Sequence, residues 1–300
     1  MSKNAKLSII IPTIEEEAIF TIIKRLKEIF PMGLEIIVVD KSSERYYRKL
    51  LEAHVKVIRQ KDKGVENAIM LGLRNAKGSI LASIDADGTH DLSGIAAGVE
   101  MVRKGEADLV LGNRFGKLGK GSMSPHIAIG NKLISKVYDI TYQKKIHDVL
   151  TGLFVMNRKA FEAIKNVTPY RAGIAFFAIE LANRGFEIKE VPIEYYKRTS
   201  GESKLTNSKV LYGIKVTSHI IRLARDYNPL LIFGTLGVIL LVSGFALGGY
   251  ILYSFITSGT FTLIGRSLIA FMLVISGILS VIAGFILDLL LEISKKINNK

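Results

Sequence analysis

Two long uncharged apolar segments near the end of the chain constrain its fold more than any other feature. No charged residue occurs from Leu230 to Gly265, and after Arg266 the sequence is again uncharged from Ser267 to Leu287. A helix needs about 20 apolar residues to cross the hydrocarbon core of a bilayer. The sequence therefore predicts a transmembrane hairpin with spans at about 230–256 and 267–287. The alternative is a pair of buried helices in a soluble domain, but such helices rarely continue this far without a charge.

Positive charges gather on one side of this predicted hairpin. The basic residues that flank the two spans away from their connecting loop are Lys204, Lys209, Lys215, Arg222, Arg225, Lys295, Lys296 and Lys300. The loop side carries only Arg266. Because cytoplasmic flanks are enriched in lysine and arginine, we expect a multi-pass protein of the cell membrane. Both flanks and the preceding domain are then cytoplasmic, with Thr257–Thr262 outside.

The formal net charge of +14 indicates anionic partners, which include nucleic acids, anionic lipids and phosphorylated substrates. The basic residues cluster beside the predicted spans, and no nucleic-acid motif occurs in the sequence. We therefore expect lipid and phosphate partners and no nucleic acid.

Small residues recur at every fourth position in both predicted spans. They are Gly244 and Gly248 in the first, and Ser276, Ser280 and Gly284 in the second. Such spacing lets helices approach closely. It is compatible with packing inside the hairpin and with a homo-oligomer formed through the transmembrane helices, so both arrangements stay open.

The first 200 or so residues alternate between strand-like and helix-like segments. The predicted strands are 7–11, 34–39, 55–58, 79–84 and 107–111, and the clearest predicted helices are 15–30 and 65–75. Uninterrupted apolar strands that alternate with helices are typical of an α/β domain whose mostly parallel sheet is covered on both faces. Ligands bind such sheets beyond the carboxyl ends of the strands. Polar residues follow several of these ends, at Thr13–Glu16, Asp40, Asp85–Asp87 and Asn113–Arg114.

Asp85 and Asp87 form the strongest local signal, because two carboxylates directly follow a buried strand. Hard divalent cations prefer oxygen ligands, and such a cation can bridge a diphosphate and neutralise its charge. The alternative is a solvated turn, since Asp87-Gly88 is itself a turn dipeptide.

Seven short motifs give this signal a context. In chain order they are Ile9-Ile10-Ile11-Pro12-Thr13 with Glu16; Ile37-Val38-Val39-Asp40; Asn67–Gly78; Asp85-Ala86-Asp87; Gly112-Asn113-Arg114; Asp148 with Thr151-Gly152; and Arg198 with Gly201, Ser203 and Lys204. In this order, and followed by membrane helices, they resemble the family 2 glycosyltransferases. The resemblance is to the branch of dolichyl-phosphate mannose synthases and polyprenyl-phosphate glycosyltransferases, and it covers nearly the whole chain.

The resemblance implies an architecture. Residues 1–204 are expected to form a cytoplasmic nucleotide-diphospho-sugar transferase domain of the GT-A type. Residues 205–228 are expected to form juxtamembrane amphipathic helices, 229–291 the transmembrane hairpin and 292–300 a basic cytoplasmic tail.

The resemblance also implies roles for individual residues. The nucleotide-sugar site is expected to contain Pro12, Glu16, Asp40, Asp85, Ala86, Asp87 and Arg114. Asp85, Asp87 and Thr89 are the expected ligands of Mg²⁺ or Mn²⁺. The lipid phosphate is expected to contact Arg198, Ser203 and Lys204. The residues expected to carry catalysis are Asp87, Arg114 and Arg198.

The implied reaction transfers a sugar from a nucleotide-sugar of the GDP-mannose or UDP-glucose class to a polyprenyl (dolichyl) phosphate. Two polyanions must then be brought together, and a metal with arginine and lysine side chains can offset their repulsion. A phosphate is already ionised at neutral pH, so we expect an inverting single displacement without a conventional base. Catalysis would rest on positioning and charge stabilisation.

Departures from the family pattern leave two alternatives open. Ile14 and Glu15 stand where the family usually has Tyr-Asn, and Lys41 follows Asp40 where a second Asp is common. All three lie in the expected nucleoside pocket, so the base stays undetermined. The alternatives are a glycosyltransferase that acts on another membrane lipid, such as one with a neutral hydroxyl, and a degenerate non-catalytic membrane scaffold.

Overall fold

The computed structural model describes residues 6–118, 123, 125–142, 145–168, 174–196, 218, 228–258 and 264–298. The chain divides into two compact units, Met1–His219 and Ile220–Lys300. Each unit is described by itself below.

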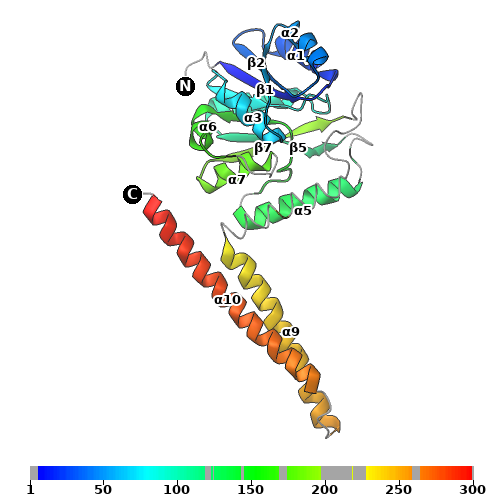
Figure 1. Ribbon diagram of the computed structural model, residues 1–300, viewed down its shortest axis with the longest axis vertical. Coiled ribbons are helices and arrows are strands. Elements are labelled where there is room, and N and C mark those ends of the chain that lie inside the picture. Colours follow the sequence, from blue (N-terminus) through cyan, green and yellow to red (C-terminus); the bar gives the residue numbers. More distant parts are fainter. Residues whose placement is uncertain are drawn as a thin grey trace. The chain divides into compact units, whose positions relative to one another are not determined.

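The first unit contains a seven-stranded sheet in the order β3-β2-β1-β4-β6-β5-β7 (Figure 1). The strands are β1 (Leu7–Thr13), β2 (Leu34–Asp40), β3 (Lys56–Arg59), β4 (Ile80–Ser83), β5 (Leu109–Leu118), β6 (Phe154–Asn157) and β7 (Ile188–Tyr195). Within this sheet only β6 runs against its neighbours, since it pairs antiparallel with β4 and β5 while the other pairings are parallel. The mostly parallel sheet predicted from the sequence is confirmed.

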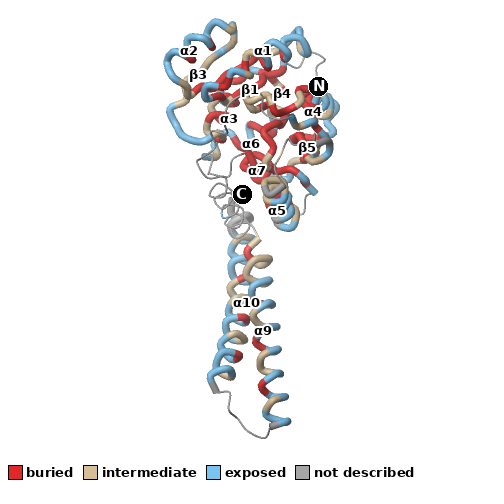
Figure 2. Tube along the Cα trace, turned by 90° about the vertical axis from the view of Figure 1, so that its right-hand side faces the viewer, coloured by how far each residue is buried: buried red, intermediate tan, exposed pale blue. Residues whose placement is uncertain are grey.

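Helices cover both faces of the sheet. They are α1 (Ala18–Ile29), α2 (Glu44–Leu51), α3 (Val65–Arg74), α4 (Ser93–Lys104), α5 (Pro125–Tyr142), α6 (Arg158–Ile164) and α7 (Ala175–Asn183). Successive side chains of a strand point to opposite faces. Ile9 and Ile11 of β1 accordingly join the core with α1, α2 and α4, whereas Ile10 lies against Gly72 of α3. Burial on both faces explains the apolar runs at the centres of β1, β2 and β4, and Figure 2 shows buried residues at the centre of this unit.

The predicted elements differ from the observed ones mainly at their ends. The first helix begins at Ala18 rather than at residue 15, because Glu15 has a left-handed φ of 50° and lies in the loop after β1. β5 continues from Leu109 to Leu118, beyond the predicted end at residue 111, and its last residues pair with β7 as far as Tyr195.

The second unit contains α9 (Pro229–Ser258) and α10 (Ile264–Asn298). Their candidate membrane spans are Pro229–Thr257 and Gly265–Ile293, with mean hydropathies of 2.5 and 2.6. Only 11% and 17% of the residues in their most apolar windows are buried in this structure. Helices in a soluble core would be mostly buried, so length, composition and exposure all fit membrane spans.

Glycines let α9 and α10 pack closely against each other. A Cβ on Gly237 would lie 2.5 Å from Val281 Cγ2, and one on Gly244 would lie 2.7 Å from Val274 Cγ2. The hydroxyl of Ser280 donates to the carbonyl of Phe233 across the hairpin at 2.7 Å. Gly244 and Ser280, two of the predicted small residues, therefore serve contacts inside the hairpin.

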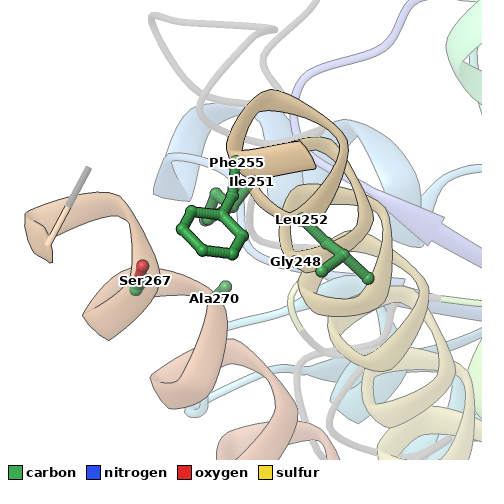
Figure 3. A pocket seen from close by; sticks show the side chains of 6 residues that line it. All are labelled: Gly248, Ile251, Leu252, Phe255, Ser267 and Ala270. Carbon is green, nitrogen blue, oxygen red and sulfur yellow. The ribbon is translucent and has the colours of Figure 1, made fainter. Parts of the chain in front are cut away.

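Gly248 lies beside an apolar cavity instead. The cavity has a volume of about 480 Å³ and is lined by Gly248, Ile251, Leu252, Phe255, Ser267 and Ala270. Figure 3 shows the ring of Phe255 between the two helices. The lining offers one hydroxyl and no charged group, so it fits hydrocarbon and does not suit a phosphorylated reactant.

Candidate active site

The carboxyl ends of the parallel strands bring the predicted site residues to one edge of the sheet. Thr13 at the end of β1 pairs in register with Asp40 at the end of β2. On the other side of β1, Ile10 pairs with Ser83, the last residue of β4. The loops that follow these strands therefore emerge next to one another, as expected for the ligand-binding edge of an α/β sheet.

Asp87 is fixed by the loop that follows β4. Its Oδ1 accepts hydrogen bonds from the backbone N–H of Thr89 at 3.1 Å and from the Thr89 hydroxyl at 2.7 Å. Gly88 between them has a φ of 73°, which suits glycine. The Thr89 hydroxyl is buried and engaged in this turn. The Thr89 hydroxyl thus helps to fix Asp87, and its direct contact with a metal ion stays a prediction.

Asp85 is held in place by Gly152, in the turn before β6. A Cβ at position 152 would clash with both Oδ2 and Cγ of the Asp85 carboxylate. No side chain other than hydrogen fits there unless the carboxylate moves. The glycine that the sequence singled out next to Thr151 thus has a physical role, which is to let the Asp85 carboxylate pack against the backbone.

Asp85 and Asp87 fit a hard divalent cation. They supply carboxylate oxygens, the donor type that Mg²⁺ and Mn²⁺ prefer. Within the described residues, no cluster of three or more His, Asp or Glu side chains could hold a metal ion without other ligands. This is the arrangement expected where one or two carboxylates share a cation with substrate phosphates.

Arg114 on β5 forms a buried, bidentate ion pair with Asp148. Its Nε lies 2.6 Å from Asp148 Oδ2 and its Nη2 lies 2.8 Å from Asp148 Oδ1. The backbone N–H of Arg114 also donates to Oδ2 at 3.1 Å. Burial alone would lower the pKa of Arg114, but the adjacent Asp148 carboxylate raises it above its ordinary value. Arg114 therefore keeps its charge at the site edge.

Glu190 on β7 holds the turn that carries Asp148 and so supports this ion pair. Its Oε1 accepts the backbone N–H groups of His147 and Asp148 at 3.0 and 2.9 Å. Its Oε2 lies 2.7 Å from His147 Nδ1. Glu190 thereby fixes the turn that carries Asp148, although nothing in its sequence context distinguished it from a solvated strand residue.

Tyr195 at the end of β7 contacts both Arg114 and His90. Its ring lies 5.4 Å from Arg114 Cζ and meets the His90 ring edge-on at a centroid distance of 5.3 Å. Burial raises the pKa of the Tyr195 phenol. Sequence reasoning missed Tyr195, because a tyrosine near the end of an alternating strand carries no motif of its own.

His90 is fully buried behind the two aspartates. Its Nδ1 lies 3.2 Å from Thr89 Oγ1 and 4.0 Å from Asp85 Oδ2. Because the Thr89 hydroxyl donates to Asp87, the His90 Nδ1–H is assigned as the donor to Thr89. Burial and, to a lesser degree, the Arg114 charge lower the pKa of His90 to about 4, against the opposing effect of Asp87 and Asp148. His90 is thus a neutral imidazole at physiological pH.

Asp40, the predicted base-binding residue, is fully buried and already paired. Its Oδ2 lies 2.7 Å from Arg59 Nη1, and its Oδ1 accepts the backbone N–H of Ser42 at 3.0 Å. Arg59 in turn stacks over the ring of Tyr47 at 4.4 Å. Both carboxylate oxygens of Asp40 are therefore engaged, and its contact with a nucleoside base stays a prediction.

The remaining predicted residues divide into two groups. Pro12, Glu16 and Ala86 lie at the carboxyl ends of β1 and β4, with Glu16 and Ala86 buried. Arg198, Ser203 and Lys204 lie outside the described residues, as does the predicted amphipathic segment 205–228 apart from residues 218 and 228.

Comparisons with known proteins identify the family of the chain. A family model described as glycosyl transferase family 2 matches residues 8–165, which is more than half of the chain. The low-salt glycan biosynthesis hexosyltransferase Agl6 of Haloferax volcanii is 29% identical over 88% of this chain and 67% of its own length. The dolichol-phosphate mannosyltransferase of Pyrococcus furiosus is 29% identical over 73% of this chain and 64% of its own length.

Solved structures show the same fold. Glucosyl-3-phosphoglycerate synthase from Mycobacterium tuberculosis, in complex with Mn²⁺, UDP and phosphoglyceric acid, matches with a TM-score of 0.57 at 16% identity over 73% of this chain and 78% of that chain. Mannosyl-3-phosphoglycerate synthase from Rubrobacter xylanophilus matches with a TM-score of 0.54 at 16% identity over 73% of each chain. Such low identities support the GT-A fold and nothing further.

Replacement of Gly152 tests the placement of Asp85. Gly152→Ala should push the Asp85 carboxylate out of position and weaken Mn²⁺ binding in the presence of a nucleoside diphosphate. Loss of a hydrogen-bonded or coordinated charge costs about 1.5–3 kcal/mol, so we expect about tenfold weaker binding or worse by isothermal titration calorimetry. Gly130→Ala is the matched control, since a Cβ at that helical position meets nothing within 4 Å. Equal affinities in the two variants would contradict this account of Gly152.

The buried His90 predicts an acid-sensitive fold. Its pKa in the folded protein, about 4, is below the ordinary 6.5, so between these values the unfolded chain binds a proton that the folded chain does not. The free energy of unfolding should therefore fall as the pH falls from 6.5 towards 4. Thermal unfolding in detergent, followed by circular dichroism, should show a weaker pH dependence in His90→Gln than in the wild type. Parallel pH profiles would show that His90 does not contribute.

Proposed function

Because the chain belongs to glycosyl transferase family 2, we propose that it transfers a sugar from a nucleotide-sugar to a polyprenyl phosphate. The observation that carries the proposal is that Asp85 and Asp87 follow the carboxyl end of β4, with the charged Arg114 near enough to the Asp85 carboxylate for it to raise the pKa of Arg114. This edge offers what a nucleoside diphosphate requires, namely carboxylates for a divalent cation and a fixed cation beside them.

On the donor side, Asp85 and Asp87 would hold Mg²⁺ or Mn²⁺, with Asp87 as the closer ligand. The bound cation would neutralise the negative charge that develops on the diphosphate leaving group. Arg114 adds a permanent positive charge that Asp148 keeps in one orientation. Asp40 with Arg59, together with Pro12 and Glu16, would contact the nucleoside of a GDP-mannose or UDP-glucose type of donor.

On the acceptor side, an ionised phosphate oxygen attacks the anomeric carbon. A new C–O bond forms as the bond to the diphosphate breaks, and the electron pair leaves with the nucleoside diphosphate. No proton has to move, so no general base is needed, and the configuration at the anomeric carbon inverts. The candidate spans of the second unit and the relative named dolichol-phosphate mannosyltransferase support a lipid acceptor.

We place the protein in the cell membrane through α9 and α10, with its catalytic unit on the cytoplasmic side. Support for this orientation comes from the basic flanks, since the segment between the helices carries no charge before Arg266. Small residues also make contacts inside the hairpin, at Gly237, Gly244 and Ser280. Their presence is therefore accounted for at these positions without an oligomer.

A matrix of donors and acceptors tests the proposal. The purified full chain would be given GDP- and UDP-sugars with Mg²⁺ or Mn²⁺, and each donor would be paired with polyprenyl phosphate, the neutral polyprenol or diacylglycerol. We expect a lipid-linked sugar only with polyprenyl phosphate, and none in excess chelator or with Asp87→Asn. Transfer to a neutral hydroxyl would favour a different lipid acceptor, and no transfer with any pair would favour the scaffold alternative.

Arg198 tests the acceptor site separately. Loss of a charged hydrogen bond to phosphate costs about 1.5–3 kcal/mol, so Arg198→Ala should raise the concentration of polyprenyl phosphate needed for half-maximal transfer about tenfold or more. Arg198→Lys should restore the requirement only in part, because an ammonium lacks the planar fork. If Arg198 only anchored the domain, transfer in detergent would be the same in all three proteins.

A further inference from the structure

The ring of Tyr195 touches two parts of the candidate donor site that lie far apart in the chain. One is Arg114 on β5, whose Cζ lies 5.4 Å from the centroid of the ring. The other is the loop after β4, in which the His90 ring meets the Tyr195 ring edge-on at a centroid distance of 5.3 Å. A tyrosine at such a junction can fill space, or it can determine how the two parts lie relative to each other.

β5 bulges at Arg114, opposite β7. Between two paired positions, β5 passes through Arg114–Gly116 while β7 passes through Ile193 alone. Pro192 of β7 has no N–H with which to continue the ladder, and proline within sheets is found at edges and bulges. A bulge re-aims the side chains that it carries. The direction of Arg114 therefore does not follow from the alternation of β5, and contacts at its guanidinium must fix it.

Backbone hydrogen bonds join the end of β7 to the loop that carries the two aspartates. They run between residues 89–91 and 194–196, at 2.8 and 3.1 Å, and form an antiparallel bridge between His90 and Tyr195. The backbone of Tyr195 therefore moves together with this loop. Its ring contacts Arg114 from a base that is fixed to the candidate metal site.

The same ring reaches Asp87 through His90. The His90 Nδ1–H donates to the Thr89 hydroxyl, which in turn donates to Asp87 Oδ1. Among the described residues, His90 Nε2 has no hydrogen-bond partner. The orientation of the imidazole thus depends on one hydrogen bond and on packing, which includes its edge-to-face contact with Tyr195. A rotation of His90 would be passed to Asp87 through Thr89.

Arg114 has one end of its guanidinium left for a ligand. Asp148 takes Nε and Nη2, which leaves Nη1 for a phosphate oxygen among the groups that the structure describes. This ion pair holds the guanidinium within its plane but lets the plane tilt, and the Tyr195 ring beside it limits the tilt. Besides burial, which raises it, the pKa of the Tyr195 phenol responds to Arg114, which lowers it, and to Asp87, which raises it.

We propose that Tyr195 is a positioning residue, which holds Arg114 and Asp87 at a fixed spacing so that the guanidinium and a divalent cation act on one diphosphate. Charges aimed in advance at the place where negative charge develops lower the barrier, because they need not be reoriented during the reaction. The proposal rests on the proposed function, since it assumes that a nucleoside diphosphate binds at this edge of the sheet. It assigns to Tyr195 an effect that acts through Arg114 and His90, not through contact with the reacting atoms.

Three substitutions separate the ring of Tyr195 from its hydroxyl and from its place in the chain. Tyr195→Phe keeps the ring, and Tyr195→Leu keeps an apolar side chain without a ring. Tyr196→Leu is the matched control, because this next tyrosine is 47% exposed and its hydroxyl donates to Glu194 Oε2 at 2.7 Å. The full chain in detergent would be titrated with Mn²⁺ at saturating GDP or UDP by isothermal titration calorimetry. Thermal unfolding and steady-state transfer would be measured on the same samples.

A cation–π contact at a partly desolvated site contributes roughly three- to thirtyfold to an equilibrium. We expect Tyr195→Leu to weaken Mn²⁺ binding by a factor in this range, and Tyr195→Phe and Tyr196→Leu to bind Mn²⁺ as the wild type does. In transfer, the kcat of Tyr195→Leu should fall by a larger factor than its KM for the donor rises. The reason is that the diphosphate carries more negative charge in the transition state than in the bound donor.

A second variant covers the case in which Tyr195→Leu does not fold. Pentafluorophenylalanine at position 195 keeps the shape of the ring but removes its attraction for cations. It should weaken Mn²⁺ binding relative to Tyr195→Phe.

Unchanged Mn²⁺ binding in Tyr195→Leu, or in the fluorinated variant, would overturn the proposal even if the unfolding temperature fell, because Tyr195 would then only fill space. An equal loss in Tyr195→Phe would overturn it too, since the hydroxyl and not the ring would carry the effect. A wild type that binds no Mn²⁺ with either nucleotide would instead refute the proposed function on which the proposal rests.

Discussion

The buried ion pair between Arg114 and Asp148 is the interaction on which the rest of the site depends. It joins β5 to the turn before β6, and Glu190 fastens that turn to β7. The same turn places Gly152 next to the Asp85 carboxylate, and β7 places Tyr195 against the His90 ring. Removing one member of a buried pair typically costs about 3–5 kcal/mol, because the other charge is left without a partner. A substitution at Asp148 would therefore disturb the turn that places Gly152 against the Asp85 carboxylate.

Much of the fold followed from local sequence because the elements concerned are strongly patterned. β1, β2 and β4 each contain an apolar run, Ile9–Ile11, Ile36–Val39 and Ile80–Ala82, that is followed by a polar strand end, and the two predicted spans are long and uncharged. β6 and β7 were not predicted. β6 has only four residues and pairs antiparallel, and the alternation of β7 does not reveal its partner. Sequence motifs named Asp85, Asp87, Arg114, Asp148 and Gly152, but contacts between residues far apart in the chain gave roles to Glu190, Tyr195 and Arg59, and no local pattern encodes those contacts.

Glycines permit close packing in both units, between two helices in one and around a carboxylate in the other. In the second unit, glycines let two apolar helices approach, as at Gly237 and Gly244, since a Cβ at either position would clash with the facing helix. In the first unit, the absence of a side chain at Gly152 lets the Asp85 carboxylate pack against the backbone, and this sets the position of a charged group. The neutral His90 behind the aspartates has a related effect, because its Nδ1 faces the Thr89 hydroxyl that fixes Asp87. Burial and close packing thus determine where charge is presented to a phosphorylated ligand.

The central claim is that Asp85 and Asp87 form a divalent-cation site for a nucleoside diphosphate at this edge of the sheet. The most direct measurement is anomalous diffraction from crystals of the full chain grown with Mn²⁺ and either GDP or UDP. The account predicts an anomalous peak within coordination distance of an Asp87 carboxylate oxygen, with the diphosphate on its far side and Arg114 beside it. A peak bound elsewhere, or a diphosphate bound at this edge without any ion near Asp85 or Asp87, would contradict it.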